Sequence, residues 1–238
     1  MQYYSISPDL YCYPQIKGFG DTIFISNPKH IFHFLDKYAG VRFTTSPPKW
    51  APHLDYLVLN PRLKKKGPSD LLSEPFNFSN GFIISDKFKT LLEGFTLSPH
   101  VYYPCRVGLG GVFWDYYYLF FYGHLGTNID YSQSPVLTFE WFKDKIIERI
   151  IFTSFSEYRN YFKKINPKHN FRFEKIVFKN ETPVYDMMNI NIVGSNEEII
   201  SERLMQEITT RKISNVRFEK LEENYILYQQ KVNSSLLL

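Results

Sequence analysis

The sequence predicts an α+β protein with a mixed, largely antiparallel sheet, a few short helices and a degenerate internal duplication. Aromatic residues make up 18% of the 238 residues, and aromatic side chains favour strands. Most apolar runs are short and are bounded by Gly, Pro, Asn or Ser, which is typical of strands joined by turns. Two similar segments, GFIISDKFKTLLEG and EEIISERLMQEI, indicate a strand that leads directly into a helix.

The first third of the chain is rich in prolines and therefore in turns. We expect residues 1–53 to form a turn-rich region packed on a main domain, residues 54–238. A short helix is expected where Asn27-Pro28 provides a start signal. The elements expected here are strands 21–27, 40–45 and 54–60 and a helix within 31–38.

The main domain is expected to contain two related halves, about 54–125 and 140–228. In the first half, FNFSNGFII indicates two strands around a Ser-Asn-Gly turn. SDKFKTLLEG indicates a helix that ends at Gly94. HVYYPCRV and GGVFWDYYYLFFYGHLG indicate two further strands, and the second has apolar residues at both alternations, so we expect it to be covered on both faces.

The second half begins after a polar loop. Strands are expected at 136–142 and 146–152, and a helix is expected over 154–165, with Ser156 as its cap. FRFEKIVFKN indicates a strand, whereas VYDMMNINIVG fits no single element. A helix then follows Ser201, and one or two strands lie in VRFEKLEENYILYQQKV.

The two similar segments share their chemistry position by position. Ile83, Ile84 and Ser85 match Ile199, Ile200 and Ser201, which lie 116 positions later. The isoleucines suit the end of a buried strand. Each serine hydroxyl is expected to cap the helix by accepting a backbone N–H of the first turn. A one-residue insertion would then align the strands HVYY and NVRF.

A serine between a strand and a helix can also be a catalytic nucleophile. The nucleophile elbow has the pattern Gly-x-Ser-x-Gly, because the tight turn requires glycine on both sides. Ser85 and Ser201 have isoleucine before them and an acidic residue after them. We therefore assign both serines a structural capping role.

Several of these segments together resemble an immunity-protein family of bacterial polymorphic toxin systems. The resemblance rests on DYLVLN, GFIISDKFKTLLEG, HVYYPCRV, IDYSQSPVLTF and EIISERLMQEITTRKISNVRFE, and covers roughly residues 54–220. It implies a cytoplasmic antidote that binds one cognate toxin domain and occludes it. The resemblance supplies no catalytic residues.

Few residues are candidates for chemistry. The loop 124–134 combines His124, Asp130, Ser132 and Ser134, the one constellation in the sequence that resembles an acid–base or nucleophile set. His30 and His33 are a weak metal-ligand pair, without an acid or cysteine at matching spacing. We expect no metal site, no cofactor and no enzymatic activity. A hydrolase that uses the 124–134 loop stays open as an alternative.

Binding is the remaining function. Tyr, Trp and Arg are favoured in protein interfaces, so Trp50, Trp114, Asp115 and Tyr116 are the candidates for toxin contact. An aromatic-rich ligand-binding module is a second alternative.

The net charge of +4 is mild and no nucleic-acid motif is present, so we expect no nucleic-acid partner. Neither a signal segment nor a membrane-length apolar run is present, so we expect a cytoplasmic protein. A local acidic patch is expected at one of two glutamate clusters. These are Glu197, Glu198 and Glu202, or Glu219, Glu222 and Glu223.

Overall fold

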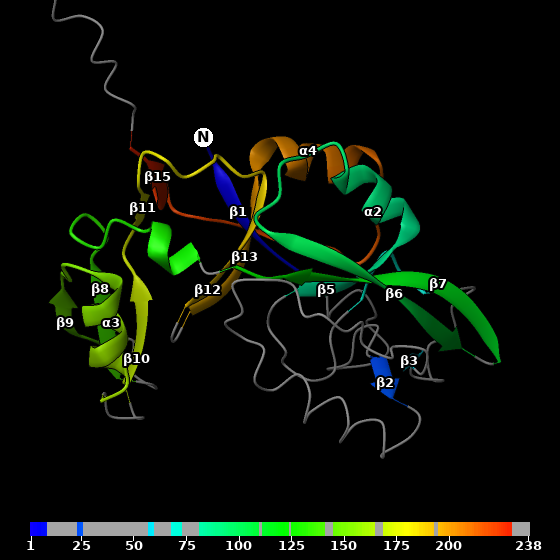
Figure 1. The fold of residues 1–238 in the computed structure, drawn as a ribbon. Coiled ribbons are helices and arrows are strands. Elements are labelled where there is room, and N and C mark those ends of the chain that lie inside the picture. Colours follow the sequence, from blue (N-terminus) through cyan, green and yellow to red (C-terminus); the bar gives the residue numbers. More distant parts are fainter. Residues whose placement is uncertain are drawn as a thin grey trace, which may run out of the picture.

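The fold is α+β, and its strands are mostly antiparallel (Figure 1). The computed structural model describes residues 1–8, 23–25, 57–59, 68–72, 81–109, 111–123, 125–140, 145–164, 169–192 and 195–229. The expected strand 40–45, the expected helix within 31–38 and the Ser-Asn-Gly turn lie outside these residues. Within them, no helix is long and apolar enough to cross a membrane.

The largest sheet has six strands in the order β2-β3-β6-β7-β5-β4. Its neighbours pair antiparallel, except β3 and β6, which are parallel. β7 lies inside this sheet between β6 and β5. This agrees with its sequence, in which consecutive residues, whose side chains point to opposite faces of the sheet, are apolar. The strands are β2 (Ile23–Ile25), β3 (Leu57–Leu59), β4 (Leu71–Leu72), β5 (Gly81–Ser85), β6 (His100–Leu109) and β7 (Val112–Phe121).

A second sheet has four antiparallel strands in the order β12-β13-β1-β14. They are β1 (Tyr3–Pro8), β12 (Met187–Ile192), β13 (Ser195–Ser201) and β14 (Val216–Lys220). β1 therefore lies in the interior of the sheet that belongs to the second half. Of the region 1–53, which was expected to pack on the main domain, the structure describes residues 1–8 and 23–25, and each of these segments forms a strand in one of the two sheets.

The remaining elements pack beside the second sheet. A three-stranded sheet has the order β10-β8-β9, with β8 (Val136–Glu140), β9 (Ile146–Ile150) and β10 (His169–Phe173). β11 (Ile176–Phe178) and β15 (Ile226–Tyr228) form a parallel pair, and η2 (Leu125–Asn128) is a short 3-10 helix. Helix α3 (Phe155–Phe162) is capped by Ser154, not by the expected Ser156, because the Ser154 hydroxyl accepts the Glu157 N–H.

Helices α2 (Asp86–Leu92) and α4 (Glu202–Thr210) lie next to each other on one side of the two sheets (Figure 1). Each helix turns apolar residues spaced by four positions toward the sheets, as one helix face requires. These residues are Phe88 and Leu92 in α2 and Leu204 and Ile208 in α4, and all four are at most 1% exposed. Both sheets contribute to the core below, through Ile84 and Ile200 among others.

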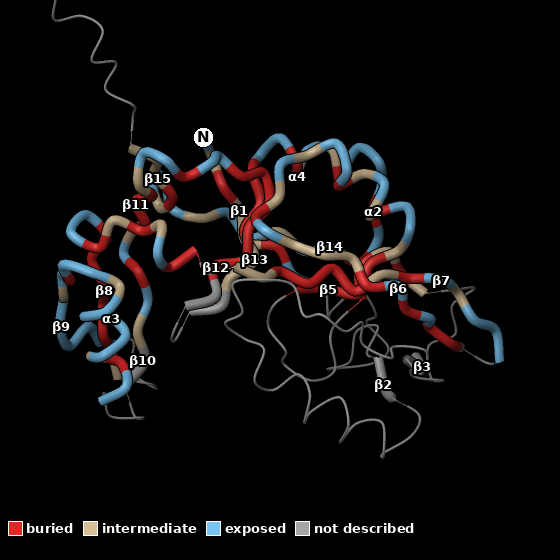
Figure 2. Tube along the Cα trace, in the orientation of Figure 1, coloured by how far each residue is buried: buried red, intermediate tan, exposed pale blue. Residues whose placement is uncertain are grey.

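The opposite face of the second sheet packs on an aromatic core. Tyr3, Met188, Ile190 and Ile199 from the sheet join aromatic side chains of α3, β10 and β11. The end of β13 is thus buried on both faces, with Ile199 in the aromatic core and Ile200 below α4, and Figure 2 shows buried residues there. This burial explains why β13 carries two consecutive isoleucines.

The two halves repeat the same four-stranded arrangement. In the first half the order is β4-β5-β7-β6, and in the second half it is β12-β13-β1-β14. The registers agree at the same 116-residue spacing: Leu71 pairs with Ile84, and Met187 pairs with Ile200. On this spacing Tyr102 of β6 corresponds to Phe218 of β14, because their partners Leu119 and Ile6 correspond as well. The expected one-residue insertion is therefore wrong, and the repeat continues without a gap.

β1 occupies in the second half the place that β7 occupies in the first. Tyr116 of β7 pairs with Ser85, and Tyr3 of β1 pairs with Ser201. The two tyrosines even share a hydrogen-bonding role. The Tyr116 hydroxyl donates to the Ser69 carbonyl at 2.9 Å, and the Tyr3 hydroxyl donates to the Tyr185 carbonyl at 3.5 Å. Ser69 and Tyr185 are themselves 116 positions apart. The two halves therefore differ in chain order. β7 follows the other strands of its half, whereas the equivalent β1 precedes the other strands of the second half.

Candidate functional site

Ser85 and Ser201 lie at the N-caps of α2 and α4. The Ser85 hydroxyl accepts the Phe88 N–H at 3.2 Å, and the Ser201 hydroxyl accepts the Leu204 N–H at 3.3 Å. Each serine hydroxyl also donates its proton to an aspartate. Ser85 donates to Asp70 at 2.7 Å, and Ser201 donates to Asp186 at 2.9 Å. Both serines therefore use their hydroxyl groups for structure, and Ser201 is fully buried.

Asp70 and Asp186 are the residues that the sequence reasoning missed. They too are 116 positions apart, and each precedes two apolar residues, Leu71-Leu72 or Met187-Met188. This match was available as a signal once the 116-residue spacing had been found. It went unused because β4 is only two residues long and carries little strand pattern of its own.

Each of these aspartates binds the loop that follows the helix of the other half. The Asp70 carboxylate accepts the Ser214 N–H at 2.8 Å, and Ser214 follows α4. The Asp186 carboxylate accepts the Thr96 N–H at 3.0 Å, and Thr96 follows α2. The exchange is reciprocal, so the two halves form one interlocked unit.

Two cations complete the reciprocal arrangement. Lys87 lies 3.5 Å from Asp70 and donates to the Lys212 carbonyl in the opposite half. Arg203, at the equivalent position of α4, forms an ion pair with Asp186 and lies over the Phe95 ring at 4.6 Å. These contacts account for the Lys or Arg that lies two positions after each capping serine.

The electrostatics of the two aspartates agree with a structural role. Burial by itself would raise the pKa of Asp186, but hydrogen bonds from Arg203, the Thr96 amide and Ser201 outweigh it and lower that pKa. Asp70 behaves alike, because Ser85, Ser214 and Lys87 outweigh the effect of burial and lower its pKa. A carboxylate held ionised in this way is a poor general acid or base near neutral pH.

In the loop 124–134, the alternative site for catalysis, the described polar side chains form hydrogen bonds within the structure. Asp130 accepts hydrogen bonds from Ser132 at 2.6 Å, from Gln133 at 2.8 Å and from Gln229 at 2.6 Å. The Ser134 hydroxyl is fully buried and accepts the Val177 N–H at 2.9 Å. His124 lies outside the described residues. Among the described residues of this loop, Asp130, Ser132 and Ser134 thus have structural hydrogen bonds.

The hairpin of β6 and β7 carries the candidate binding residues Trp114 and Asp115. Its outer part, residues 105–115, which we call the hairpin tip, has no counterpart among the described residues of the second half. On the repeat spacing, β14 ends at the position of Pro104, and β1 begins at the position of Tyr116. The hairpin tip is therefore an addition to the duplicated scaffold, and Figure 1 shows it extending past α2.

The hairpin tip exposes apolar and cationic side chains. Val112 and Phe113 are 55% and 50% exposed. The Phe113 ring packs over Gly108, where an added Cβ would lie 2.8 Å from the ring, and Arg106 lies 5.1 Å from the ring centroid. Asp115 is exposed and pairs in register with Arg106, whereas Trp114 is partly buried.

Tyr116 was expected to contact a partner, and the structure corrects this expectation. It is only 5% exposed, and its hydroxyl donates to the Ser69 carbonyl. Tyr116 fills the same buried position as Tyr3, so its role is in the scaffold. Trp50, the other candidate, lies outside the described residues.

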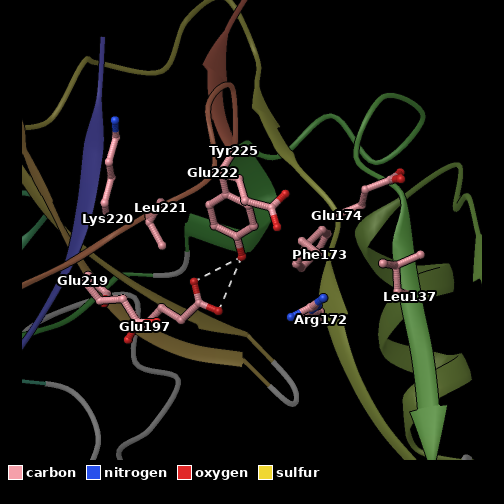
Figure 3. A pocket seen from close by; sticks show the side chains of 11 residues that line it. Leu137, Arg172, Phe173, Glu174, Glu197, Glu219, Lys220, Leu221, Glu222 and Tyr225 are labelled. Carbon is pink, nitrogen blue, oxygen red and sulfur yellow. Dashed lines mark hydrogen bonds between the residues drawn. The ribbon is translucent and has the colours of Figure 1, made fainter. Parts of the chain in front are cut away.

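A pocket of about 480 Å³ lies between the second sheet and β10 (Figure 3). Its walls come from β1, β8, β10, β13, β14 and the segment between β14 and β15. The lining residues are Ser5, Leu137, Arg172, Phe173, Glu174, Glu197, Glu219, Lys220, Leu221, Glu222 and Tyr225. The pocket thus joins members of both expected acidic patches, but Glu198 belongs to the other face of β13.

The duplication explains why the pocket exists. In the first half, the positions of Ser5 and Glu219 are filled by the buried rings of Tyr118 and Tyr103. The position of Glu197 is Gly81, which has φ +153° and where a Cβ would lie 1.7 Å from the Leu119 carbonyl oxygen. Glycine lets β7 approach β5 there. With Glu197 at this position, the pairing of β1 with β13 spans only Tyr3–Ser5.

Tyr225 and Glu197 form the polar centre of the pocket. The Tyr225 hydroxyl lies 3.1 Å and 3.4 Å from the two Glu197 carboxylate oxygens, and Figure 3 shows it pointing toward Glu197. Burial and the neighbouring Glu197 charge raise the pKa of Tyr225, so the phenol stays a hydrogen-bond donor at neutral pH. Arg172 of β10 also lines the pocket, next to Phe173.

The described part of the chain offers no group of three or more His, Cys, Asp or Glu side chains placed to hold a metal ion. Comparison with models of known protein families finds no match for this chain. Comparison with curated proteins finds no match either.

Proposed function

We propose that this chain is a non-enzymatic immunity protein that binds a cognate bacterial toxin domain in the cytoplasm and occludes it. The observation that carries the proposal is the hairpin tip, residues 105–115, which is added to a duplicated scaffold. Its exposed Val112 and Phe113 and its Arg106 have the chemistry of interface anchors. The partner class comes from the motif resemblance in residues 54–220.

The scaffold supports a binding role for a second reason. Ser85 and Ser201 cap helices and donate to aspartates, so neither hydroxyl is available as a nucleophile. Reciprocal contacts of Asp70 and Asp186 hold the two halves together. A surface built on such a rigid unit loses little entropy when a partner binds.

We expect Phe113→Asp to weaken toxin binding by about tenfold to a hundredfold, because it places a charge in the centre of an apolar contact. The probe is a C-terminal toxin domain sought in the gene beside that of this chain, where the proposed function places it. Binding is measured by calorimetry with the purified domain, and protection is measured as growth of cells that co-express both proteins.

The matched control is Ile151→Asp, since Ile151 is 51% exposed and directly follows β9, which Figure 1 shows on the opposite side of the molecule from the hairpin tip. Ile151→Asp should keep native affinity and full protection, and both variants should keep the native melting temperature. Equal loss from the two variants would rule out the hairpin tip as the interface. A native chain that neither binds nor protects against the neighbouring toxin domain would overturn the proposed function.

The pocket favours a second candidate function, a ligand-binding module. Its volume lies within the roughly 300–1,000 Å³ that is usual for small-molecule sites, and Phe173 and Tyr225 provide aromatic surface. Four carboxylates line the pocket against two cations, Arg172 and Lys220, and this negative excess favours a cationic compound. The carboxylates are those of Glu174, Glu197, Glu219 and Glu222.

Ser5→Tyr should abolish ligand binding at this pocket, because the equivalent Tyr118 fills the corresponding space in the first half. The measurement is a ligand screen of organic amines by NMR, with shifts followed in β10 and β14. The control Ser7→Tyr changes an exposed residue of the same strand and should leave binding unchanged. Ligand shifts that persist in Ser5→Tyr would place the binding elsewhere.

A further inference from the structure

The second half of the molecule has no strand of its own at the place of β7. In the first half, β7 follows β6 after a short turn, so the two strands form a hairpin. In the second half, the equivalent strand β1 comes from the opposite end of the described chain, and Tyr3 and Tyr185 are 182 positions apart. No hairpin therefore ties β1 to β13 or β14.

β1 is held between β13 and β14 by backbone pairing on both sides. Tyr3–Ser5 pair with Ser201–Ile199, and Tyr4–Pro8 pair with Lys220–Val216. Gln2 extends this contact, because its side chain donates to the Leu221 carbonyl at 2.9 Å and its carbonyl accepts the Glu202 N–H at 3.0 Å. An extended segment placed between two strands satisfies its backbone groups without needing a covalent connection to either strand.

Two side chains of β1 enter opposite cores. Tyr3 is 2% exposed and lies in the aromatic core with Ile199, whereas Ile6 is 3% exposed and lies below α4 with Leu204. Ser7, between Ile6 and Pro8, is exposed. The site between β13 and β14 thus binds a tyrosine of an extended chain on one face of the sheet. On the other face it binds an isoleucine three positions later.

We infer that the space between β13 and β14 is a strand-binding site, and that β1 is an exchangeable strand. Its ligand is an extended peptide with the pattern Tyr-x-x-Ile, and the occupant other than the chain's own β1 is β1 of a second copy. This inference does not depend on the proposed toxin partner.

The attachment of β1 is weaker than that of β7 at identifiable positions. β7 pairs with β5 along Gly81–Ser85, whereas the pairing of β1 with β13 spans Tyr3–Ser5. The small Ser5 side chain occupies the position at which the first half has the buried ring of Tyr118. The hydrogen bond of the Tyr3 hydroxyl is also longer than that of the Tyr116 hydroxyl. Exchange should therefore occur at β1, and not at β7, which its hairpin also retains.

The experiment uses the full chain with a specific protease site inserted between Pro8 and Ile23. After cleavage, the protein is unfolded in denaturant and refolded with an excess of a fluorescently labelled peptide that corresponds to residues 1–8. We expect the labelled peptide to co-elute with the folded protein and to give a high fluorescence anisotropy. The uncleaved chain, refolded in parallel, should incorporate at least tenfold less peptide, because its own strand is present at a high effective concentration.

Matched peptides test the recognition rule. Peptides with Tyr3→Ala or Ile6→Asp should bind at least tenfold more weakly, since each loses a buried apolar contact worth more than about 1.4 kcal/mol. A peptide with Ser7→Ala should bind like the native peptide. The inference is overturned if the uncleaved chain refolds but the cleaved chain with peptide does not. Equal binding by the cleaved and uncleaved chains, or binding indifferent to Tyr3 and Ile6, would overturn it as well.

Discussion

Asp186→Ala is expected to lower the free energy of unfolding by about 2–4 kcal/mol, because it leaves the buried Ser201 hydroxyl and two partly buried donors without their acceptor. The Asp186 side chain is 9% exposed, and it accepts hydrogen bonds from Ser201, Arg203 and the Thr96 amide. It therefore joins the cap of α4 to the loop after α2. Urea denaturation followed by circular dichroism measures the effect.

The pH dependence identifies the carboxylate as the cause. The pKa of Asp186 in the folded protein lies below the ordinary value of 3.8, so its stabilisation is present above pH 3.8 and is lost as the pH falls through the folded pKa. The difference between the native protein and Asp186→Ala should accordingly shrink in acid. A difference that stays constant with pH would show that the substitution acts through packing alone.

Arg203→Ala is the matched control for Asp186→Ala. The Arg203 side chain is 63% exposed, so loss of this ion pair should cost less than about 1 kcal/mol. Asp70→Ala should resemble Asp186→Ala with a smaller effect, because the Asp70 side chain is 16% exposed. A loss from Arg203→Ala as large as that from Asp186→Ala would contradict the assignment of the buried carboxylate as the centre of the network.

The sequence was informative wherever a local pattern determines structure. The Ser85 and Ser201 segments predicted a strand followed by a helix, and both lie where these patterns placed them. The apolar residues at both alternations of β7 predicted a central strand, and β7 is one. These features depend on neighbours within a few positions, so one sequence contains the needed information.

Pairing between distant segments was not predictable in the same way. Residues 3–8 have a strand pattern, but nothing in it indicates β13 and β14 as partners. The cap of α3 was also placed wrongly, because Ser154 and Ser156 are both acceptable caps and only the path of the chain decides between them. Likewise, the burial of Tyr116 follows from its equivalence to Tyr3, which needed the sheet order.

The candidate site shows the same limit. Trp114 and Asp115 were selected because they lie beside a glycine turn, and they do lie on the hairpin tip. The exposed Val112 and Phe113 were missed, since sequence alone does not show that this hairpin extends beyond the repeated scaffold. The pocket was also missed, because its walls combine segments that are far apart in the chain.

Glu198→Gln is expected to raise the free energy of unfolding by about 2 kcal/mol near pH 8, because a carboxylate is costly even at this partly buried position. Glu198 takes the place that Phe82 has in the first half, where Phe82 is 5% exposed and part of the core. Burial raises the pKa of Glu198 to about 8, although Asn189 donates a hydrogen bond to it at 3.0 Å. Glutamine keeps the oxygen that accepts this bond and carries no charge.

The sign of the pH dependence follows from the raised pKa. Between pH 4.5 and about 8, the folded protein retains a proton on Glu198 that the unfolded chain has lost. The free energy of unfolding of the native protein should therefore fall as the pH rises through this range. The advantage of Glu198→Gln should be small near pH 4, grow up to about pH 8 and then stay level.

Glu223→Gln, at an exposed position, is the control and should follow the native protein at every pH. Urea denaturation at steps from pH 4 to pH 9 measures all three proteins. If Glu198→Gln and the native protein give parallel curves, Glu198 is ionised in the folded state and is solvated through the pH range. Glu198 would then not occupy a core position equivalent to that of Phe82.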